Sequence, residues 1–382
     1  MNQKKQETKR PASRPATKSM DSPKNTDAAT TAANEVSGSG SFSSSSQKSR
    51  KKKRTGKKLF FLILAEVIIL LLLVPFIFLF LQFTRIHTAD IETEHLAICN
   101  QDENMDDYIN LMFFGVDSRD NELTENTRSD SMILVSINKK NSDIRLVSFF
   151  RDCYVFVDGH GYTKLTHAYS YGGPELALNT INQNFDLNVK DFVTVNFSAL
   201  TNVIDALGGV EIKITEDEID YVNSYTRDVA RINGTTPHKI RKAGKQTLDG
   251  TQATAYCRVR YTAGGDFTRA QRQRTVLYAI ARKAKKSNPI ALLNVVKEIM
   301  PQVYTSLHTG DLLKLSLRAF SYDIKKDTGY PFDNKVMTVN SMSVVIPETV
   351  ESNVTRLHKF LFRTKNYVPS ARVMEISAGI PF

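Results

Sequence analysis

The segment 258–274 contains the side chains whose chemistry is easiest to interpret in this sequence. It reads Arg-Val-Arg-Tyr-Thr-Ala-Gly-Gly-Asp-Phe-Thr-Arg-Ala-Gln-Arg-Gln-Arg, with five arginines in seventeen residues. The planar guanidinium group of arginine can donate two hydrogen bonds at once to the oxygens of a phosphate group. We therefore expect the segment to contribute to a site for a phosphate or a pyrophosphate.

The first two arginines lie in residues 253–261, whose pattern predicts a β-strand. Residues two apart in a strand point to the same face, so Arg258 and Arg260 would leave the strand side by side. Strand positions of this kind are usually half buried, and a buried guanidinium group needs a partner. A bound anion would supply that partner.

A Gly-Gly pair turns the chain, and Thr268 then has the residue type of a helix N-cap. The predicted helix runs to about Lys285 and places Arg269 and Arg272 one turn apart, near the positive end of the helix dipole. The alternative is that these arginines form a solvated helix face. Their convergence with the two arginines before the turn favours an anion site.

Two carboxylates precede the arginines in the sequence. Asp117 follows an apolar run, in Gly-Val-Asp-Ser-Arg, and Asp130 opens the next run, in Arg-Ser-Asp-Ser. Each could simply cap a turn. If the two strands pair as a hairpin, however, the carboxylates become neighbours, and paired carboxylates close to a phosphate are typical of Mg²⁺ sites.

A third polar element, Arg151-Asp152, ends a β-rich run, and Lys164 and His167 follow on a predicted loop. We expect His167 to be structural, because no cysteine or serine in a nucleophile motif accompanies it. The sequence has no Walker loop, no His-Glu-x-x-His zinc motif and no Gly-x-Ser-x-Gly elbow. It also lacks an Asp-x-Asp triplet, which weakens the case for a metal-dependent sugar-nucleotide glycosyltransferase.

The positive charge of the chain is confined to its N-terminal tail. Residues 1–58 carry fifteen Lys/Arg against four Asp/Glu, and this excess equals the formal net charge of +11 of the whole protein. The tail is rich in Ser, Thr, Ala, Pro and Lys and is predicted to be disordered. The basic pI therefore does not indicate nucleic-acid binding, and no helix-turn-helix pattern supports it.

Residues 59–83 are almost entirely apolar and predict a transmembrane helix. A helix of this length spans about 37 Å, against a hydrocarbon core of about 30 Å. Basic residues crowd the side before the helix, so the positive-inside rule places the tail in the cytoplasm and residues 84–382 outside. We expect a stem at 84–106, a folded outer domain at 107–346 and a C-terminal extension at 347–382. Three cysteines are too few for a disulfide scaffold.

The outer domain alternates strand and helix patterns, which predicts an α/β fold with a mixed central β-sheet sandwiched by helices. The predicted strands are residues 111–116, 131–138, 143–157, 192–196, 210–214, 335–339 and 343–346. The predicted helices are residues 174–184, 199–207, 289–303 and 312–320.

Six short motifs in a fixed order resemble the LytR-CpsA-Psr family. They are Gly-x-Asp-x-Arg (115–119), Arg-Ser-Asp-Ser (128–131), Ser-Phe-Phe-Arg-Asp (148–152), Ala-Leu-Gly-Gly-Val (206–210), Leu-Asp-Gly-x-x-Ala (248–253), and Arg-x-Arg with Asp-Phe-x-Arg-x-x-Arg-Gln (258–273). The resemblance covers roughly residues 110–280. Phe150, Thr268 and Arg274 depart from the residues usual in the family, which leaves the loop shape and the acceptor preference open.

The resemblance implies an enzyme that moves a teichoic acid, a capsular or a similar polymer from undecaprenyl pyrophosphate to peptidoglycan. It implies Asp117 and Asp130 as ligands of Mg²⁺. The implied pyrophosphate contacts are Arg119, Arg151, Arg258, Arg260, Arg269 and Arg272. Arg151, Asp152 and Asp266 are the candidate catalytic residues, and either aspartate could be the general base. The alternative is a non-enzymatic envelope protein that binds anionic wall polymer or regulates the envelope response.

Overall fold

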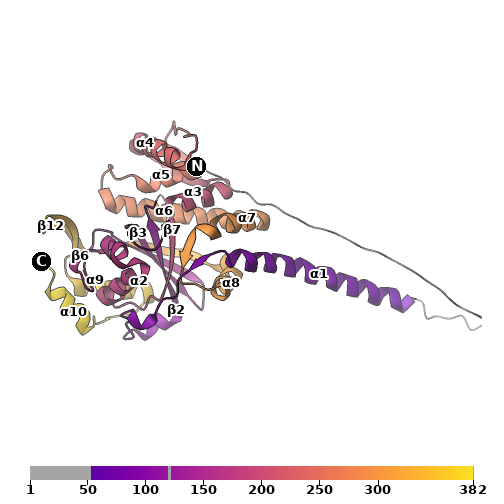
Figure 1. Ribbon diagram of the computed structural model, residues 1–382, viewed down its shortest axis with the longest axis horizontal. Helices are drawn as coiled ribbons and strands as arrows, with labels where there is room; N and C mark the ends of the chain where they lie inside the picture. The colour runs from indigo at the N-terminus through magenta and orange to yellow at the C-terminus, as the bar shows by residue number, and fades with distance from the viewer. Residues whose placement is uncertain (1–52, 119–121, 382) are drawn as a thin grey trace, which may run out of the picture. The chain divides into compact units, whose positions relative to one another are not determined.

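The computed structural model describes residues 53–118 and 122–381 (Figure 1). The predicted tail, apart from its last six residues, and Arg119 lie outside these ranges. The first helix, α1 (Lys53–Phe83), contains the predicted span. Within the described residues, only its segment Lys58–Phe83 is long and apolar enough to cross a membrane.

The domain is built on a seven-stranded mixed sheet, which confirms the predicted fold class. The strand order is β1-β10-β7-β2-β3-β4-β11. Strands β2, β3 and β4 are antiparallel neighbours, whereas β7 runs parallel to β2 and β11 runs parallel to β4. The strands are β1 (His87–Thr88), β2 (Tyr108–Val116), β3 (Ser129–Asn138), β4 (Asp143–Phe149), β7 (Asp191–Asn196), β10 (Val303–Thr305) and β11 (Asp323–Tyr330).

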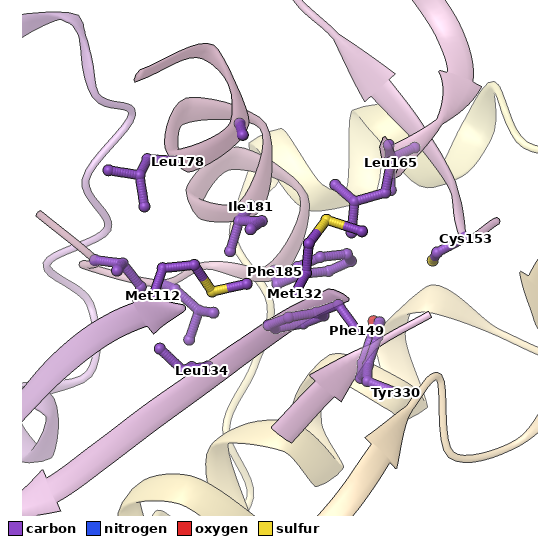
Figure 2. Packing of buried hydrophobic residues seen from close by; sticks show 14 of the residues in the cluster. Met112, Met132, Leu134, Phe149, Cys153, Leu165, Leu178, Ile181, Phe185 and Tyr330 are labelled. Carbon is purple, nitrogen blue, oxygen red and sulfur yellow. The ribbon is translucent and has the colours of Figure 1, made fainter. Parts of the chain in front are cut away.

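One face of the sheet is covered by α2, α9 and α10 (Figure 1). Figure 2 shows Met112, Met132 and Phe149 of the sheet packed against Ile181 and Phe185 of α2. These elements are α2 (Leu165–Phe185), α9 (Val350–Phe362) and α10 (Ala371–Ala378), with the hairpins β5 (Tyr154–Val157)–β6 (Gly161–Lys164) and β12 (Asn334–Val339)–β13 (Met342–Pro347). The C-terminal residues, which had no predicted role, therefore belong to the main hydrophobic core.

The predicted stem, residues 84–106, is also part of the folded domain. It supplies β1 at the edge of the sheet and two short 3₁₀ helices, η1 (Thr93–His95) and η2 (Glu103–Asp107). Leu96 and Met105 from this stretch are buried in the same core as α2. The chain therefore passes from α1 into the sheet within a few residues.

The second face of the sheet carries the remaining helices. Alternation along β7 separates the two sides, because Phe192 lies in the core with α2 while Val193 and Val195 pack on the opposite face. The elements of this half are α3 (Phe197–Ala206), β8 (Val210–Ile214), α4 (Glu216–Asn233), β9 (Gly244–Leu248), α5 (Gly250–Arg258), α6 (Gly265–Lys286), α7 (Pro289–Ile299), η3 (Met300–Gln302), α8 (Thr309–Leu317) and η4 (Ala319–Ser321).

The predicted strand at 253–261 is wrong, because these residues include most of α5. Asp249 caps this helix, and Gln252 completes a reciprocal capping box with it. Every residue from Gly250 to Cys257 is buried, so the segment shows no polar face from which a helical period could be read. The sequence signal that was missed is the Asp-x-x-Gln pattern of the capping box.

Candidate functional site

The two predicted carboxylates lie at the same end of the sheet. β2 and β3 form the expected antiparallel hairpin, with Gly115 opposite Ser131 and Val116 opposite Ser129. Asp117 directly follows β2, and Asp130 is the second residue of β3. The register therefore confirms that the two positions are neighbours.

Asp130 is the centre of an arginine cluster. Its Oδ1 accepts a hydrogen bond of 2.9 Å from Arg151, and its Oδ2 accepts one of 3.0 Å from Arg260. Arg269 donates to the backbone oxygen of Asp130 at 3.3 Å and lies 3.9 Å from Oδ2. The three arginines come from the turn after β4, the loop between α5 and α6, and the start of α6, so the tertiary fold alone brings them together.

Asp266 is the second carboxylate of this cluster. It lies 3.1 Å from Arg269, 3.5 Å from Arg151 and 3.9 Å from Arg260. Its position in the first turn of α6 also places it at the positive end of that helix. Three guanidinium groups therefore share two carboxylates, which leaves one positive charge in excess within the cluster.

Burial and charge oppose each other at Asp130. Burial raises the pKa of its carboxyl, but the charges of Arg269, Arg151 and Arg260 outweigh this effect, and the pKa lies below its ordinary value. Arg269 is almost fully buried, and burial together with the charge of Arg151 lowers its pKa to about 10. Both groups are therefore ionised at neutral pH.

The cluster contains hydrogen-bond donors that are not used. Nε of Arg151 and Nε of Arg269 are buried and donate to no described residue. Both arginines line a cavity of about 220 Å³, whose apolar wall includes Phe149, Phe150 and Val344. An unsatisfied buried donor is costly, so an anion that accepts from these nitrogens would be stabilised here.

Arg258 occupies a neighbouring position but has a different carboxylate. It is the last residue of α5, and its guanidinium lies 3.7 Å from Asp117 and 5.0 Å from the centre of the Phe197 ring. Because α5 is a helix, Arg258 and Arg260 do not share a strand face. They lie instead beside the two carboxylates of the β2–β3 hairpin, Asp117 and Asp130 respectively.

Arg272 does not join the cluster. Its Nε donates to Glu218 at 2.9 Å, and its other nitrogens donate to Val259 O at 3.0 Å and to Thr262 Oγ1 at 2.6 Å. The side chains of Arg272 and Glu218 are 3% and 10% exposed, so this ion pair is buried. Residues three apart on a helix lie on the same side of it. The two side chains nevertheless have different partners, because Arg272 contacts Glu218 of α4 and Arg269 contacts Asp130.

The predicted helix start is also corrected. Gly264, not Thr268, is the N-cap of α6, and its φ of +88° belongs to the left-handed region that favours glycine. The Thr268 hydroxyl donates to the carbonyl of Ala263 at 2.7 Å. The Gly-Gly turn thus places the first turn of α6, which carries Asp266, directly against the arginine cluster.

Asp152 lies at the edge of the cluster and pairs with Lys164, which belongs to β6 and not to the predicted loop. Its Oδ1 is 2.7 Å from Lys164 Nζ, and its Oδ2 is 3.4 Å from Arg151 Nε. Lys164 is twelve residues from Asp152 in the sequence, and the β5–β6 hairpin (residues 154–164) brings the two side chains together. Without knowledge of this hairpin, the sequence does not assign Lys164 to the site. His167 accepts from or donates to Thr163 Oγ1 at 2.8 Å, and burial and the charges of Arg128 and Lys164 lower its pKa.

Asp117 and Asp130 form a small ligand set for Mg²⁺. Residues 53–118 and 122–381 contain no group of three or more His, Cys, Asp or Glu side chains arranged to hold a metal ion. Asp117 and Asp130 therefore offer two carboxylates at most. Mg²⁺ is typically held by one or two carboxylates together with phosphate oxygens and water. The two aspartates meet this ligand count, but both oxygens of Asp130 already accept from Arg151 and Arg260, so an ion would share this carboxylate with the arginines.

Comparisons with known proteins identify relatives with named activities. The polyisoprenyl-teichoic acid–peptidoglycan teichoic acid transferase TagT of Bacillus subtilis is 32% identical over 242 residues, which cover 62% of this chain and 68% of that protein. TagU of Enterococcus faecalis, which is also named as a polyisoprenyl-teichoic acid–peptidoglycan teichoic acid transferase, is 29% identical over 214 residues. These residues cover 54% of this chain and 64% of TagU.

Solved structures agree with these relatives. The structure of TagT bound to LIIa-WTA matches with a TM-score of 0.55 and 26% identity, covering 69% of this chain and 95% of that one. The LytR_cpsA_psr family model matches residues 77–359, nearly the whole domain described above. The chain belongs to the LytR_cpsA_psr family, the family that its six motifs resemble.

Proposed function

We propose that the protein is a phosphotransferase that attaches an undecaprenyl-pyrophosphate-linked anionic glycopolymer, such as a teichoic acid or a capsule, to peptidoglycan. The observation that carries this proposal is the arginine cluster on Asp130, in which the buried Nε atoms of Arg151 and Arg269 form no hydrogen bond with the described residues. The nearest carboxylate oxygen to Arg151 Nε is that of Asp152, in an ion pair of 3.4 Å. The names of the relatives, which are transferases of teichoic acid to peptidoglycan, support the reaction class.

The arginines hold the substrate through its charge. Arg151, Arg260 and Arg269 bind the pyrophosphate oxygens, exchanging part of their contact with Asp266 for phosphate. Asp266 is 35% exposed, whereas Asp130 is 14% exposed, so Asp266 is the carboxylate that can yield its place more easily. The negative charge of the pyrophosphate opposes attack by an oxygen nucleophile, and fixed cations that lower this barrier are the main catalytic resource in such reactions.

The transfer follows a simple balance of bonds. A muramyl hydroxyl of peptidoglycan attacks the glycan-side phosphorus and forms a new phosphorus–oxygen bond. The bond from this phosphorus to the bridging oxygen breaks, and undecaprenyl phosphate leaves with that oxygen. The hydroxyl proton passes to a carboxylate, for which Asp266 and Asp152 are the candidates within the cluster.

Asp117 and Asp130 would hold Mg²⁺ in this reaction. The ion would neutralise charge on the pyrophosphate oxygens when it is bound. Arg258 is placed to orient Asp117, since its guanidinium contacts that carboxylate from the end of α5. Phe197 in turn limits the movement of Arg258 by lying against its guanidinium plane.

The position of the site suits a lipid-linked substrate. Val303 of β10 packs with Phe83 of α1 and pairs with Val195 of β7, whose neighbour Asn196 pairs with Val116. Two strand spacings, roughly 10 Å, therefore separate the strand beside α1 from the strand that leads to Asp117. We propose that α1 anchors the protein in the cell membrane, with the tail in the cytoplasm and the domain outside.

The direct test is incubation of the full-length protein with a lipid-pyrophosphate-linked oligosaccharide and peptidoglycan fragments. The expected product is a phosphodiester-linked conjugate, formed together with polyprenyl phosphate. An envelope protein that only binds anionic polymer would retain the oligosaccharide without forming either product. That outcome would contradict the proposed function.

A further inference from the structure

Helices α7 and α8 are unusually open for parts of a folded domain. No side chain of either helix, all of which are described, is buried. Ile290 at the start of α7, Leu317 at the end of α8 and Phe320 in η4 are 71%, 78% and 62% exposed. We call these two helices with η4 the α7–α8 face.

Helices α7 and α8 border the point where α1 enters the domain. Phe83 at the end of α1 forms a small buried cluster with Ile86 and Val303. The partly buried side chains around this cluster are Leu79 of α1, Val193 and Val195 of β7, Val296, Ile299 and Met300 of α7 and η3, and Leu312 and Leu313 of α8. The inner sides of both helices therefore pack around the last turns of the predicted membrane span.

The same stretch of the chain is strongly basic. Residues 281–326 contain nine Lys/Arg against three Asp/Glu, although the 324 residues after the tail are balanced at thirty-six of each. Lys283, Lys285 and Lys286 end α6, Lys297 and Lys314 lie on the two helices, and Lys325 and Lys326 follow η4. This segment is therefore a basic part of the folded domain, although Lys285 and Lys325 pair with Asp323 and Lys314 pairs with Asp311. Lys325 and Lys326 lie on β11, at the opposite edge of the sheet from β1.

We propose that the α7–α8 face rests on the surface of the membrane leaflet from which α1 emerges. Ile290, Leu317 and Phe320 enter the boundary between headgroups and acyl chains, and Lys297 and Lys314, which lie on the two helices, contact anionic lipid phosphates. Apolar residues on a basic amphipathic surface have this arrangement in helices that lie in the membrane interface. The inference rests on α1 as a membrane span, as proposed above, but not on the transfer reaction.

The short connection between α1 and the sheet supports the contact of the α7–α8 face with the membrane. Only three residues separate the end of α1 from β1, so the chain has no long stem that would lift the domain away from the bilayer. An exposed apolar group beside a membrane span can bury its surface in the lipid, which is favourable by the hydrophobic effect. The face would fix the height of the arginine cluster above the bilayer.

The chain has no tryptophan, so a single introduced tryptophan gives an unambiguous fluorescence signal. Full-length Phe320→Trp is reconstituted into vesicles of phosphatidylglycerol and brominated phosphatidylcholine, whose bromine atoms quench only residues in the bilayer. The matched control is Val368→Trp, because Val368 is 75% exposed and precedes α10, on the opposite face of the sheet. Phe76→Trp, within α1, reports on the span itself.

We expect bromine quenching for Phe320→Trp and Phe76→Trp, and quenching by aqueous iodide for Val368→Trp. Equal access of iodide to Phe320→Trp and Val368→Trp, with Phe76→Trp still quenched by bromine, would overturn the proposed face. Loss of bromine quenching at Phe76→Trp would overturn the span on which the face depends. Replacing the anionic lipid with a neutral one should weaken the quenching of Phe320→Trp alone. Unchanged quenching of Phe320→Trp in neutral vesicles would show that the lysines do not contribute to membrane contact.

Discussion

Arg151 donates a hydrogen bond of 2.9 Å to Asp130, and the burial of this pair links substrate binding to the stability of the domain. The side chains of Arg151 and Asp130 are 21% and 14% exposed. Asp130 also receives a hydrogen bond from Arg260. A change at this carboxylate should therefore affect folding as well as catalysis, and the two effects can be separated by pH.

Asp130→Asn should destabilise the protein by about 1.5–3 kcal/mol at neutral pH, the range for a hydrogen bond to a charged group. The pKa of Asp130 lies below its ordinary value in the folded state, so the carboxylate stabilises the fold above the unfolded-state pKa. This contribution is lost as the pH falls through the folded-state pKa. The difference in unfolding free energy between variant and wild type should be largest above about pH 5 and shrink below about pH 4.

Denaturant unfolding at a series of pH values measures this difference. A constant difference across the acidic range would show that the charge of Asp130 does not stabilise the fold. Ser129→Ala changes the neighbouring residue, whose hydroxyl is buried without a hydrogen-bond partner among the described residues, and is the control for changes in local packing.

Arg272 should behave as a structural residue, although its position in the motif suggests the substrate. Arg272→Met leaves Glu218 buried without its partner, which should cost about 3–5 kcal/mol of unfolding free energy. The double variant Arg272→Met, Glu218→Met removes both charges and should recover most of that loss. Thermal unfolding of the three proteins tests this. A stable Arg272→Met protein with no transfer activity would instead return Arg272 to the substrate site.

The sequence predicted the local parts of this site better than its long-range contacts. Asp117 and Asp130 could be placed together because a hairpin between neighbouring strands requires it. The contact of Asp130 with Arg151 depends on the pairing of β3 with β4, and its contact with Arg269 crosses 139 residues of sequence. The motifs identified these arginines as candidate site residues, but no local sequence pattern showed that both would contact Asp130.

The errors in prediction have a common physical origin. Residues 253–257 are all buried, so their pattern could not distinguish a helix from a strand. Arg272 was grouped with Arg269 because both lie near the start of one helix. The helix directs them to different neighbours, and only the position of α4 reveals that Glu218 is within reach of Arg272.

Asp266 is the stronger candidate for the general base. Its side chain is 35% exposed, whereas that of Asp152 is 16% exposed and is held by Lys164 at 2.7 Å. A general base typically contributes a factor of about 10²–10⁴ to the rate. Asp266→Asn should therefore reduce kcat by about this factor.

Asp152→Asn is the matched comparison, because it removes the other carboxylate of the cluster. It should reduce kcat less. The opposite result, with the larger loss of kcat in Asp152→Asn, would assign the base to Asp152. Binding of the lipid-linked substrate to both variants should be measured, since each aspartate also contacts Arg151.

Asp117 offers a test of the proposed metal that does not disturb the fold. Its side chain is 42% exposed, and its described ion pair, with Arg258, is 3.7 Å long. Asp117→Ala should keep the unfolding temperature of the wild type but lose the stimulation of transfer by Mg²⁺. Asp228→Ala in α4 is the control, because it removes an exposed carboxylate with a 3.5 Å ion pair to Arg231. Unchanged Mg²⁺ stimulation in Asp117→Ala would exclude this residue as a ligand.

Arg258→Lys separates an enzyme from a protein that only binds anionic polymer. Lysine keeps the charge but cannot reproduce the planar fork or the contact with the Phe197 ring. If Arg258 orients Asp117 or contacts the pyrophosphate during transfer, the variant should lose about 1.5–3 kcal/mol of transition-state stabilisation, roughly a ten- to more than a hundredfold reduction in rate.

A groove that recognises only charge predicts the opposite result for Arg258→Lys. Lysine would then substitute almost freely, and polymer affinity would fall with salt to the same extent in both proteins, because exposed charges are screened by ions. Transfer rate and polymer affinity should therefore be measured for wild type and variant at two salt concentrations. A variant with the wild-type rate would remove Arg258 from the reaction. Salt-sensitive binding without transfer by either protein would favour a binding protein, because a charged groove explains that behaviour without any chemistry at the pyrophosphate.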